Sequence, residues 1–171
     1  MTVEGFDGFH PCVYLDNLST QEYHCVMIPP FDHNGNLPPG EHQTTWAELE
    51  QRYAITQHRR LLLEGFRAAI ETLKIAGCTQ VWLDGSFITS KTVPGDFDAC
   101  WSFTGLDPTL LDPVLLDFTH RRATQKAKYR GELFPKDAFA TPQGSRFIDF
   151  FQIDKLNQQP KGIIVLDLST L

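Results

Sequence analysis

The sequence predicts an α+β domain in which helices pack mainly on one face of a mixed central β-sheet. Apolar residues recur at helical spacing over residues 58–76, which is typical of an amphipathic helix. Shorter apolar runs over residues 79–83, 97–103 and 146–153 have the length of strands and are separated by Gly and Pro. The 171 residues are expected to form one domain, with residues 1–27 as an N-terminal extension.

Composition and charge exclude several classes of protein. The chain is 42% hydrophobic and 21% charged, which is ordinary for a soluble globular domain. Its formal net charge of -6 argues against bulk binding to DNA, which needs many cationic contacts to phosphate. No apolar run approaches the length of a membrane span, and the N-terminus lacks the pattern of a signal peptide. We therefore expect a cytoplasmic protein without membrane contacts, in which four scattered cysteines are reduced thiols: Cys12, Cys25, Cys78 and Cys100.

The first third of the chain is expected to form a β-hairpin, a loop and a short helix. Two apolar runs within residues 1–28 flank turn residues at 16–20, which predicts the hairpin. Residues 29–42 contain four prolines and two glycines and are expected to form an irregular loop. Thr45 followed by Glu48 forms a capping box, so a helix is expected over about 45–53.

Helices and strands alternate in the expected structure of the remaining chain. The helix over residues 58–76 is expected to end at Gly77, a residue suited to a helix C-cap. The elements expected after it are a strand at 79–83, one or two helical turns at 87–91, a turn at 93–95, a strand at 97–103, a helix from 107 to about 128, a loop at 131–145, a strand at 146–153 and an edge strand at 162–168.

Asp96 and Asp98 are the first candidate catalytic residues and metal ligands. They are separated by one residue at the start of an expected strand, so both carboxylates project from the same face. Two convergent carboxylates repel each other unless a cation lies between them. Their hard oxygen ligands suit Mg²⁺, and such a site leaves room for substrate phosphates.

Asp149 is the candidate for a third carboxylate at the same site. It lies within the aromatic segment 146–153, where an unpaired buried charge costs several kcal/mol, so a partner is expected. A second metal ion shared with Asp96 and Asp98 would supply that partner, as Mg²⁺ or Mn²⁺. Three carboxylates and two ions form the arrangement that clamps both oxygens of a phosphoryl displacement. Asp154 is an alternative third acid, at the end of the expected strand beside Lys155.

Gly85 and Ser86 are expected to bind the phosphates of a nucleotide. They end one expected strand and open a short helix, where a glycine allows close backbone approach and helix amides attract anions. Three cations are expected to assist: Lys91, Lys128 and Arg130. The last two belong to the basic stretch 121–130, which holds five of the fifteen Lys and Arg residues. The alternative interpretation of this stretch is a solvated helix face.

The order Gly85-Ser86, nine residues, then Asp96-Phe97-Asp98 resembles the signature of the polymerase-β-like nucleotidyltransferase superfamily. In that superfamily a third acidic residue lies on a later strand, and Asp149 is the matching position. The segments 32–42 and 82–87 are also similar to a small bacterial and phage family of nucleotidyltransferase-like proteins, over roughly residues 28–168.

The resemblance implies a nucleotidyltransferase fold and a metal-dependent enzyme. The expected reaction moves a nucleoside monophosphate from an NTP, with ATP as the expected donor, to a hydroxyl of a protein, RNA or small molecule. Asp149 would also help to deprotonate that hydroxyl. Many such enzymes add a second helical domain for the acceptor, and the segment after Asp149 is too short to supply one.

Two other functions remain open from the sequence. Proteins of this size with the resembling motif are often members of toxin–antitoxin modules, so an antitoxin-type protein could use the fold to bind a cognate partner. A regulator that binds a nucleotide without transferring it is the third hypothesis.

Overall fold

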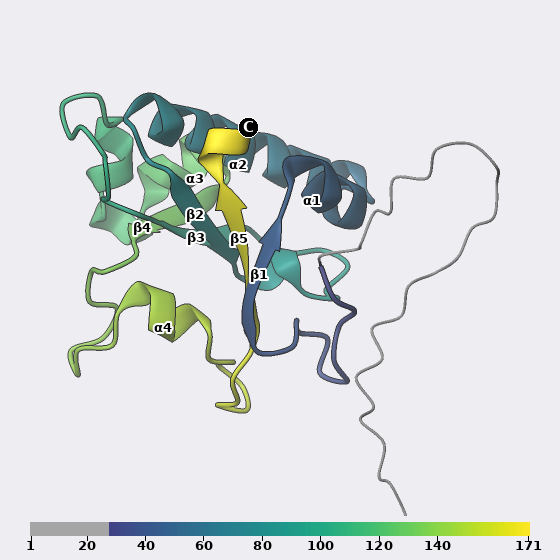
Figure 1. Ribbon diagram of the computed structural model, residues 1–171. Helices are drawn as coiled ribbons and strands as arrows, with labels where there is room; N and C mark the ends of the chain where they lie inside the picture. The colour runs from purple at the N-terminus through teal and green to yellow at the C-terminus, as the bar shows by residue number, and fades with distance from the viewer. Residues whose placement is uncertain (1–27) are drawn as a thin grey trace, which may run out of the picture.

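The computed structural model describes residues 28–171, which form a five-stranded mixed sheet and four α-helices (Figure 1). The strand order is β1-β5-β2-β3-β4; β1–β5 and β3–β4 are parallel, while β5–β2 and β2–β3 are antiparallel. The α+β class and the mixed sheet are therefore confirmed. The predicted N-terminal hairpin lies outside the described residues. The strands are β1 (Gly40–Thr44), β2 (Gln80–Asp84), β3 (Phe97–Trp101), β4 (Gly131–Pro135) and β5 (Gly162–Asp167).

Three helices lie on one side of the sheet and the fourth on the other (Figure 1). The first group is α1 (Trp46–Tyr53), α2 (Gln57–Ile75) and α3 (Ala123–Tyr129), and the fourth is α4 (Phe147–Phe151). The predicted capping box of Thr45 and Glu48 starts α1. The turn after α2 is a Schellman motif, in which Cys78 N donates to Leu73 O and Gly77, at φ 90°, donates to Lys74 O.

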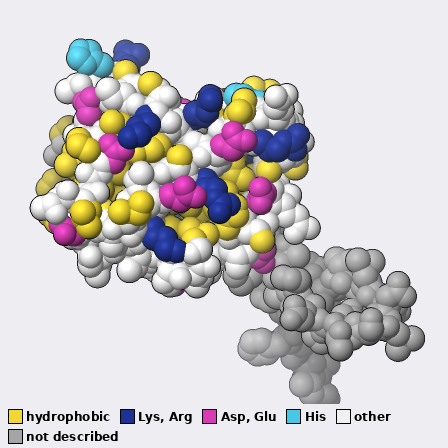
Figure 2. Space-filling view, turned by 90° about the horizontal axis from the view of Figure 1, so that it is seen from above, with side chains coloured by type: hydrophobic (Ala, Val, Ile, Leu, Met, Phe, Trp, Pro, Cys, Tyr) yellow, Lys and Arg dark blue, Asp and Glu magenta, His cyan; other side chains and the backbone are white. Residues whose placement is uncertain are grey.

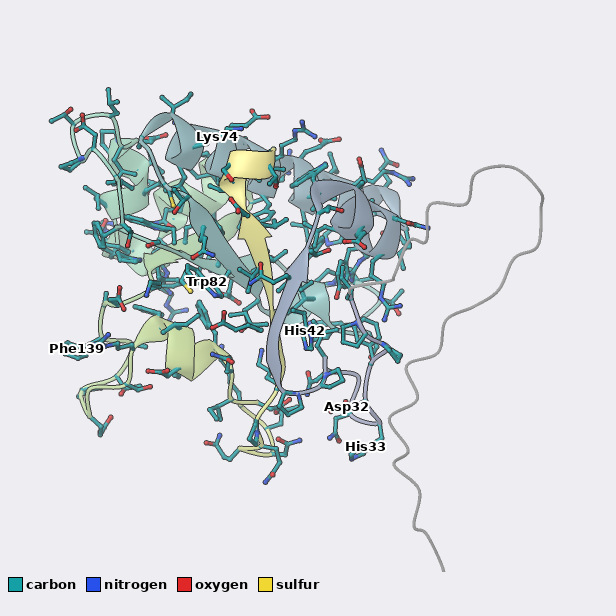
Figure 3. The ribbon with its side chains drawn as sticks, viewed as in Figure 1. Asp32, His33, His42, Lys74, Trp82 and Phe139 are labelled. Atoms are coloured by element: carbon teal, nitrogen blue, oxygen red, sulfur yellow. The ribbon has the colours of Figure 1, made fainter. Side chains whose placement is uncertain are left out.

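Alternating side chains of the strands build two apolar layers. Val81, Leu83 and Phe97 are buried under α1 and α2, where they belong to the larger core. Trp82 and Cys100 point to the other face and pack with Phe151 of α4 in the smaller core. Figure 3 shows Trp82 on the α4 side of the sheet. Within the described residues, one face of the sheet is thus covered by three helices and the other by the single short helix α4.

The outer face above the helices carries mixed charges. Acidic and basic side chains are interspersed there among hydrophobic ones (Figure 2). This view therefore shows no broad field of a single sign. Within residues 28–171, no helix is long and apolar enough to cross a membrane.

Two predicted elements of the second half have the wrong type. The segment 146–153, predicted as a strand, contains α4, because Phe147 and Phe151 are four residues apart and both face the sheet from a helical turn. The segment 131–145, predicted as a loop, contains β4. Its identity as a strand depends on pairing with β3 and on Gln125, whose side chain accepts a hydrogen bond from Leu133 N.

Two further predictions require correction. The predicted helix from 107 to about 128 is mostly irregular, with two short 3₁₀ turns (Pro113–Leu116 and Thr119–Arg121) before α3. The predicted edge strand is instead β5, which lies between β1 and β2 and is buried on both faces, as its nearly continuous apolar sequence allows. The polar strand β1, which begins inside the predicted loop at 29–42 and continues to Thr44, forms that edge.

Gly65 tests the packing of α3 against α2. A Cβ added at Gly65 would lie 2.0 Å from the carbonyl oxygen of Tyr129, which is backbone and cannot rotate away. We expect Gly65→Ala to lower the free energy of unfolding by about 1–3 kcal/mol, although alanine favours helix by about 1 kcal/mol. Urea denaturation measures the change. Gly95→Ala is the control, because no atom lies within 4 Å of its Cβ position. Equal stability of the two variants would contradict this packing.

Candidate functional site

Three carboxylates occupy neighbouring positions on three adjacent strands. Asp84 ends β2 and pairs in register with Asp98 of β3, which pairs in register with Glu132 of β4. Residues paired in this way project from the same face of a sheet. The face is the one that carries Trp82 and α4, because side chains alternate along each strand. We call Asp84, Asp98 and Glu132 the carboxylate row. Asp96 lies just before β3, two residues before Asp98, and is not part of the row.

The turn Gly85-Ser86 follows the row directly. Gly85 has φ 83°, a left-handed conformation that favours glycine, and its Cβ position lies only 2.5 Å from Asp98 Oδ2. Ser86 then begins a short 3₁₀ helix (Ser86–Ile88). Among the described residues the Ser86 hydroxyl has no hydrogen-bond partner. The structure therefore brings the predicted Gly85, Ser86, Asp96 and Asp98 into one place.

A buried arginine fixes the segment that follows this turn. The Arg59 guanidinium is 2% exposed and donates to the carbonyl oxygens of Tyr53 at 2.9 Å, Lys91 at 2.8 Å and Phe87. Burial lowers the pKa of Arg59. The Tyr53 hydroxyl adds a hydrogen bond to Ile88 O at 3.4 Å. Because these contacts hold backbone rather than side chains, they fix the path of the chain from Ser86 to Lys91.

Cations flank both ends of the carboxylate row. The ammonium of Lys161 pairs with Asp84, and both side chains are nearly buried. At the other end, Arg122 Nη2 lies 2.7 Å from Glu132 Oε2, and Lys126 pairs with Glu132 Oε1. Lys126 Nζ also lies 3.5 Å from Asp96 Oδ2.

Asp98, at the centre, is the carboxylate of the row that lacks a cation. It makes no ion pair or hydrogen bond with the residues described in the structure. Burial, and after it the negative charges of Asp84, Asp96 and Glu132, raise its pKa to about 7, while Lys155 opposes them. Burial also raises the pKa of Asp84, against the effect of Lys161. The row is thus short of positive charge at its centre.

The donor chemistry of the row suits a hard cation. Carboxylate oxygens of Asp96, Asp98 and Glu132 are ligands that Mg²⁺ and Mn²⁺ prefer. As the side chains stand, no group of three or more His, Cys, Asp or Glu within residues 28–171 has an arrangement that could hold a metal ion. Both oxygens of Glu132 are engaged by Arg122 and Lys126. A metal at this position would require those contacts to rearrange.

Asp149 lies apart from the carboxylate row in every described contact. It is exposed on α4, in place of the predicted strand, and its charge is not among the main influences on the pKa of Asp98. The alternative acid, Asp154, caps the backbone of Leu156 and Asn157 and accepts a hydrogen bond from Asn36. The acid that pairs with Asp98 on the neighbouring strand β4 is Glu132.

The predicted phosphate-binding cations are also distributed differently. Lys91 is exposed and contributes its carbonyl to the Arg59 contacts. Lys128 pairs with Asp112, and Arg130 is exposed at the end of α3. The same basic stretch does supply two cations to the row, at positions 122 and 126. Arg122 precedes α3 in a left-handed conformation and Lys126 lies within the helix, so the helical spacing of the sequence did not reveal them as a pair.

Comparison with known proteins identifies a family. The model described as "Family of unknown function (DUF6932)" matches residues 29–167, so the chain belongs to this family. Neither the curated proteins nor the solved structures contain a match to the chain. The match begins just after the N-terminal extension predicted from the sequence and includes every residue of the carboxylate row.

The raised pKa of Asp98 predicts how stability depends on pH in the metal-free protein. Its folded pKa of about 7 lies above the usual value, so the neutral form stabilises the fold, and this contribution is lost as the pH rises from about 4 through 7. Asp98→Asn should remove the loss and raise the free energy of unfolding at pH 8 by an amount on the order of 1–3 kcal/mol.

Urea denaturation in EDTA from pH 4 to 8 measures this effect. Asp149→Asn, which removes an exposed carboxylate outside the row, is the matched control. A pH dependence that is the same in wild type and Asp98→Asn would contradict the crowding of charge around Asp98.

Proposed function

We propose that this family member is a metal-dependent nucleotidyltransferase, which transfers a nucleoside monophosphate from an NTP, with ATP as the expected donor, to an acceptor hydroxyl. The observation that carries the proposal is the position of the carboxylate row beside the Gly85-Ser86 turn, on the less covered face of the sheet. The order of strand, Gly-Ser turn and Asp-x-Asp strand agrees with a nucleotidyltransferase fold, which is the finer description we infer for this α+β structure.

The metal site of this proposal consists of Asp96, Asp98 and Glu132. Glu132 takes the place that the sequence assigned to Asp149, because strand pairing puts it beside Asp98. When bound, Mg²⁺ or Mn²⁺ would neutralise charge on the reacting phosphate and orient it. Asp84, whose charge is matched by Lys161, supports the row from its other end.

The phosphates of the nucleotide would lie over the Gly85-Ser86 turn. The space of a Cβ at Gly85 is taken by the Asp98 carboxylate, whereas the Ser86 hydroxyl, which has no hydrogen-bond partner among the described residues, is available to donate a hydrogen bond. Arg59 keeps this backbone in place, so the site is organised before the nucleotide binds. Lys155 is the nearby cation that makes no ion pair with a described residue, and its charge acts on both Asp84 and Asp98.

A transfer assay tests the enzyme and its third carboxylate together. The full chain is incubated with Mg²⁺, α-labelled ATP, total RNA and a protein extract, and labelled products are separated. We expect transfer by the wild type, a loss of about 10²–10³-fold in Asp98→Asn and in Glu132→Gln, and nearly full activity in Asp149→Asn. Loss of activity in Asp149→Asn with retention in Glu132→Gln would restore Asp149 as the third carboxylate.

Lys155 gives a separate test of the phosphate position. Lys155→Ala should weaken binding of a non-hydrolysable ATP analogue by about tenfold, since a phosphate contact contributes about 1–2 kcal/mol. Isothermal titration calorimetry measures the affinity. Lys128→Ala is the control, because Lys128 pairs with Asp112. If Lys128→Ala weakens binding and Lys155→Ala does not, the phosphates lie on the α3 side as the sequence predicted.

An interaction protein is the second candidate function. Four large hydrophobic side chains are exposed in the connection from β3 to α3: Phe103, Leu110, Leu116 and Phe118. Such side chains suit a protein partner, as expected for an antitoxin-type member of a two-protein module. This function predicts a stable complex that survives Asp98→Asn. A nucleotide-binding regulator, the third candidate, predicts tight ATP binding without transfer in the assay above.

A further inference from the structure

Lys126 occupies oxygens of two carboxylates in the proposed metal site. Its ammonium pairs with Glu132 Oε1 and lies 3.5 Å from Asp96 Oδ2. It therefore bridges two of the three carboxylates in the proposed metal site. A metal ion and Lys126 cannot occupy these oxygens together, since both carry positive charge and need the same space.

The two cations of this end differ in how firmly they are held. The Arg122 guanidinium contacts Glu132 Oε2 through two nitrogens, at 2.7 and 2.8 Å, and also lies 4.7 Å from the centre of the Phe134 ring. The Lys126 side chain is 41% exposed, and its ion-pair partners among residues 28–171 are these two carboxylates. An ion pair open to water in this way is weak, so Lys126 is the cation that can leave.

Exchange of Lys126 does not require α3 to move. Gln125 anchors the helix through a hydrogen bond from Leu133 N at 2.8 Å and a bond to Leu115 O at 3.3 Å. Tyr129, at the end of α3, is buried against α2. Rotation of the lysine side chain would open Asp96 Oδ2 and Glu132 Oε1, while Arg122 stays on Glu132 Oε2. The phosphates of a nucleotide offer the ammonium a new partner, because phosphate oxygens bind lysine well.

We propose that Lys126 is an exchangeable counter-ion that couples metal binding to nucleotide binding at this site. Without nucleotide, Lys126 occupies Asp96 and Glu132 and keeps the affinity for metal low. When a nucleoside triphosphate binds, its phosphates draw the ammonium away, and a divalent cation takes the vacated oxygens. By thermodynamic linkage, metal must raise nucleotide affinity by the same factor. This inference rests on the proposed function and adds a form of regulation to it.

Manganese binding to the full chain tests the proposal without an activity assay. Free Mn²⁺ is measured by electron paramagnetic resonance, with and without a non-hydrolysable ATP analogue. Lys126→Met should bind Mn²⁺ alone roughly tenfold more tightly than wild type, a difference of about 1.4 kcal/mol. The increase in Mn²⁺ affinity caused by the nucleotide should be smaller in Lys126→Met by the same factor. Lys126→Gln serves as a second variant in case Met disturbs folding.

The controls separate this proposal from the proposed function. Lys128→Met, two residues along the same helix, should bind Mn²⁺ like the wild type, because Lys128 pairs with Asp112. Mn²⁺ affinity that is unchanged or weaker in both Lys126 variants, while Asp98→Asn abolishes binding, would overturn the role of Lys126 alone. Mn²⁺ affinity that Asp98→Asn leaves unchanged would overturn the metal site, and the role of Lys126 with it.

Discussion

Repulsion among the carboxylates of one sheet face is the constraint on which the rest of the site depends. Strand register places Asp84, Asp98 and Glu132 side by side, and like charges directly opposite each other destabilise a sheet. Lys161 and the cations before and within α3 neutralise the two ends of the row. Asp98, at the centre of the row, has a raised pKa and no ion-pair or hydrogen-bond partner for its carboxylate among the described residues. Groups whose pKa is perturbed by burial and by neighbouring charges cluster at functional sites.

The sequence predicted the elements whose signals are local. The capping box at Thr45, the helical periodicity of α2 and the short apolar strands β2 and β3 all fall within a few residues of where they were expected. The elements α4 and β4 are only five residues long, so contacts made elsewhere in the chain decide their type. Leu133 is in a strand because it pairs with β3 and its backbone N–H donates to the Gln125 side chain. Phe147 is in a helix whose aromatic side chains pack on the apolar face of the sheet.

The residues of the candidate site also differ in whether a local sequence pattern or a long-range contact identifies them. Gly85, Ser86, Asp96 and Asp98 are close along the chain, so their spacing revealed them. Glu132 reaches the row only through the parallel pairing of β3 with β4, which no local pattern in the sequence shows. The aromatic surroundings of Asp149 indicated burial, but in a short helix the aromatic side chains face the sheet while the aspartate faces solvent. The sequence predicted Asp149 as the third carboxylate, whereas strand pairing places Asp84 and Glu132 beside Asp98.

The central proposal is that Asp96, Asp98 and Glu132 hold divalent cations beside a bound nucleotide. Crystals of the chain soaked with Mn²⁺ and a non-hydrolysable ATP analogue, with data collected at the manganese absorption edge, test it most directly. The account predicts anomalous peaks at coordination distance, about 2.0–2.2 Å, from oxygens of Asp98 and Glu132, with the ammonium of Lys126 moved from Glu132 to phosphate. Peaks at Asp149, or a nucleotide bound with no manganese at the row, would contradict it.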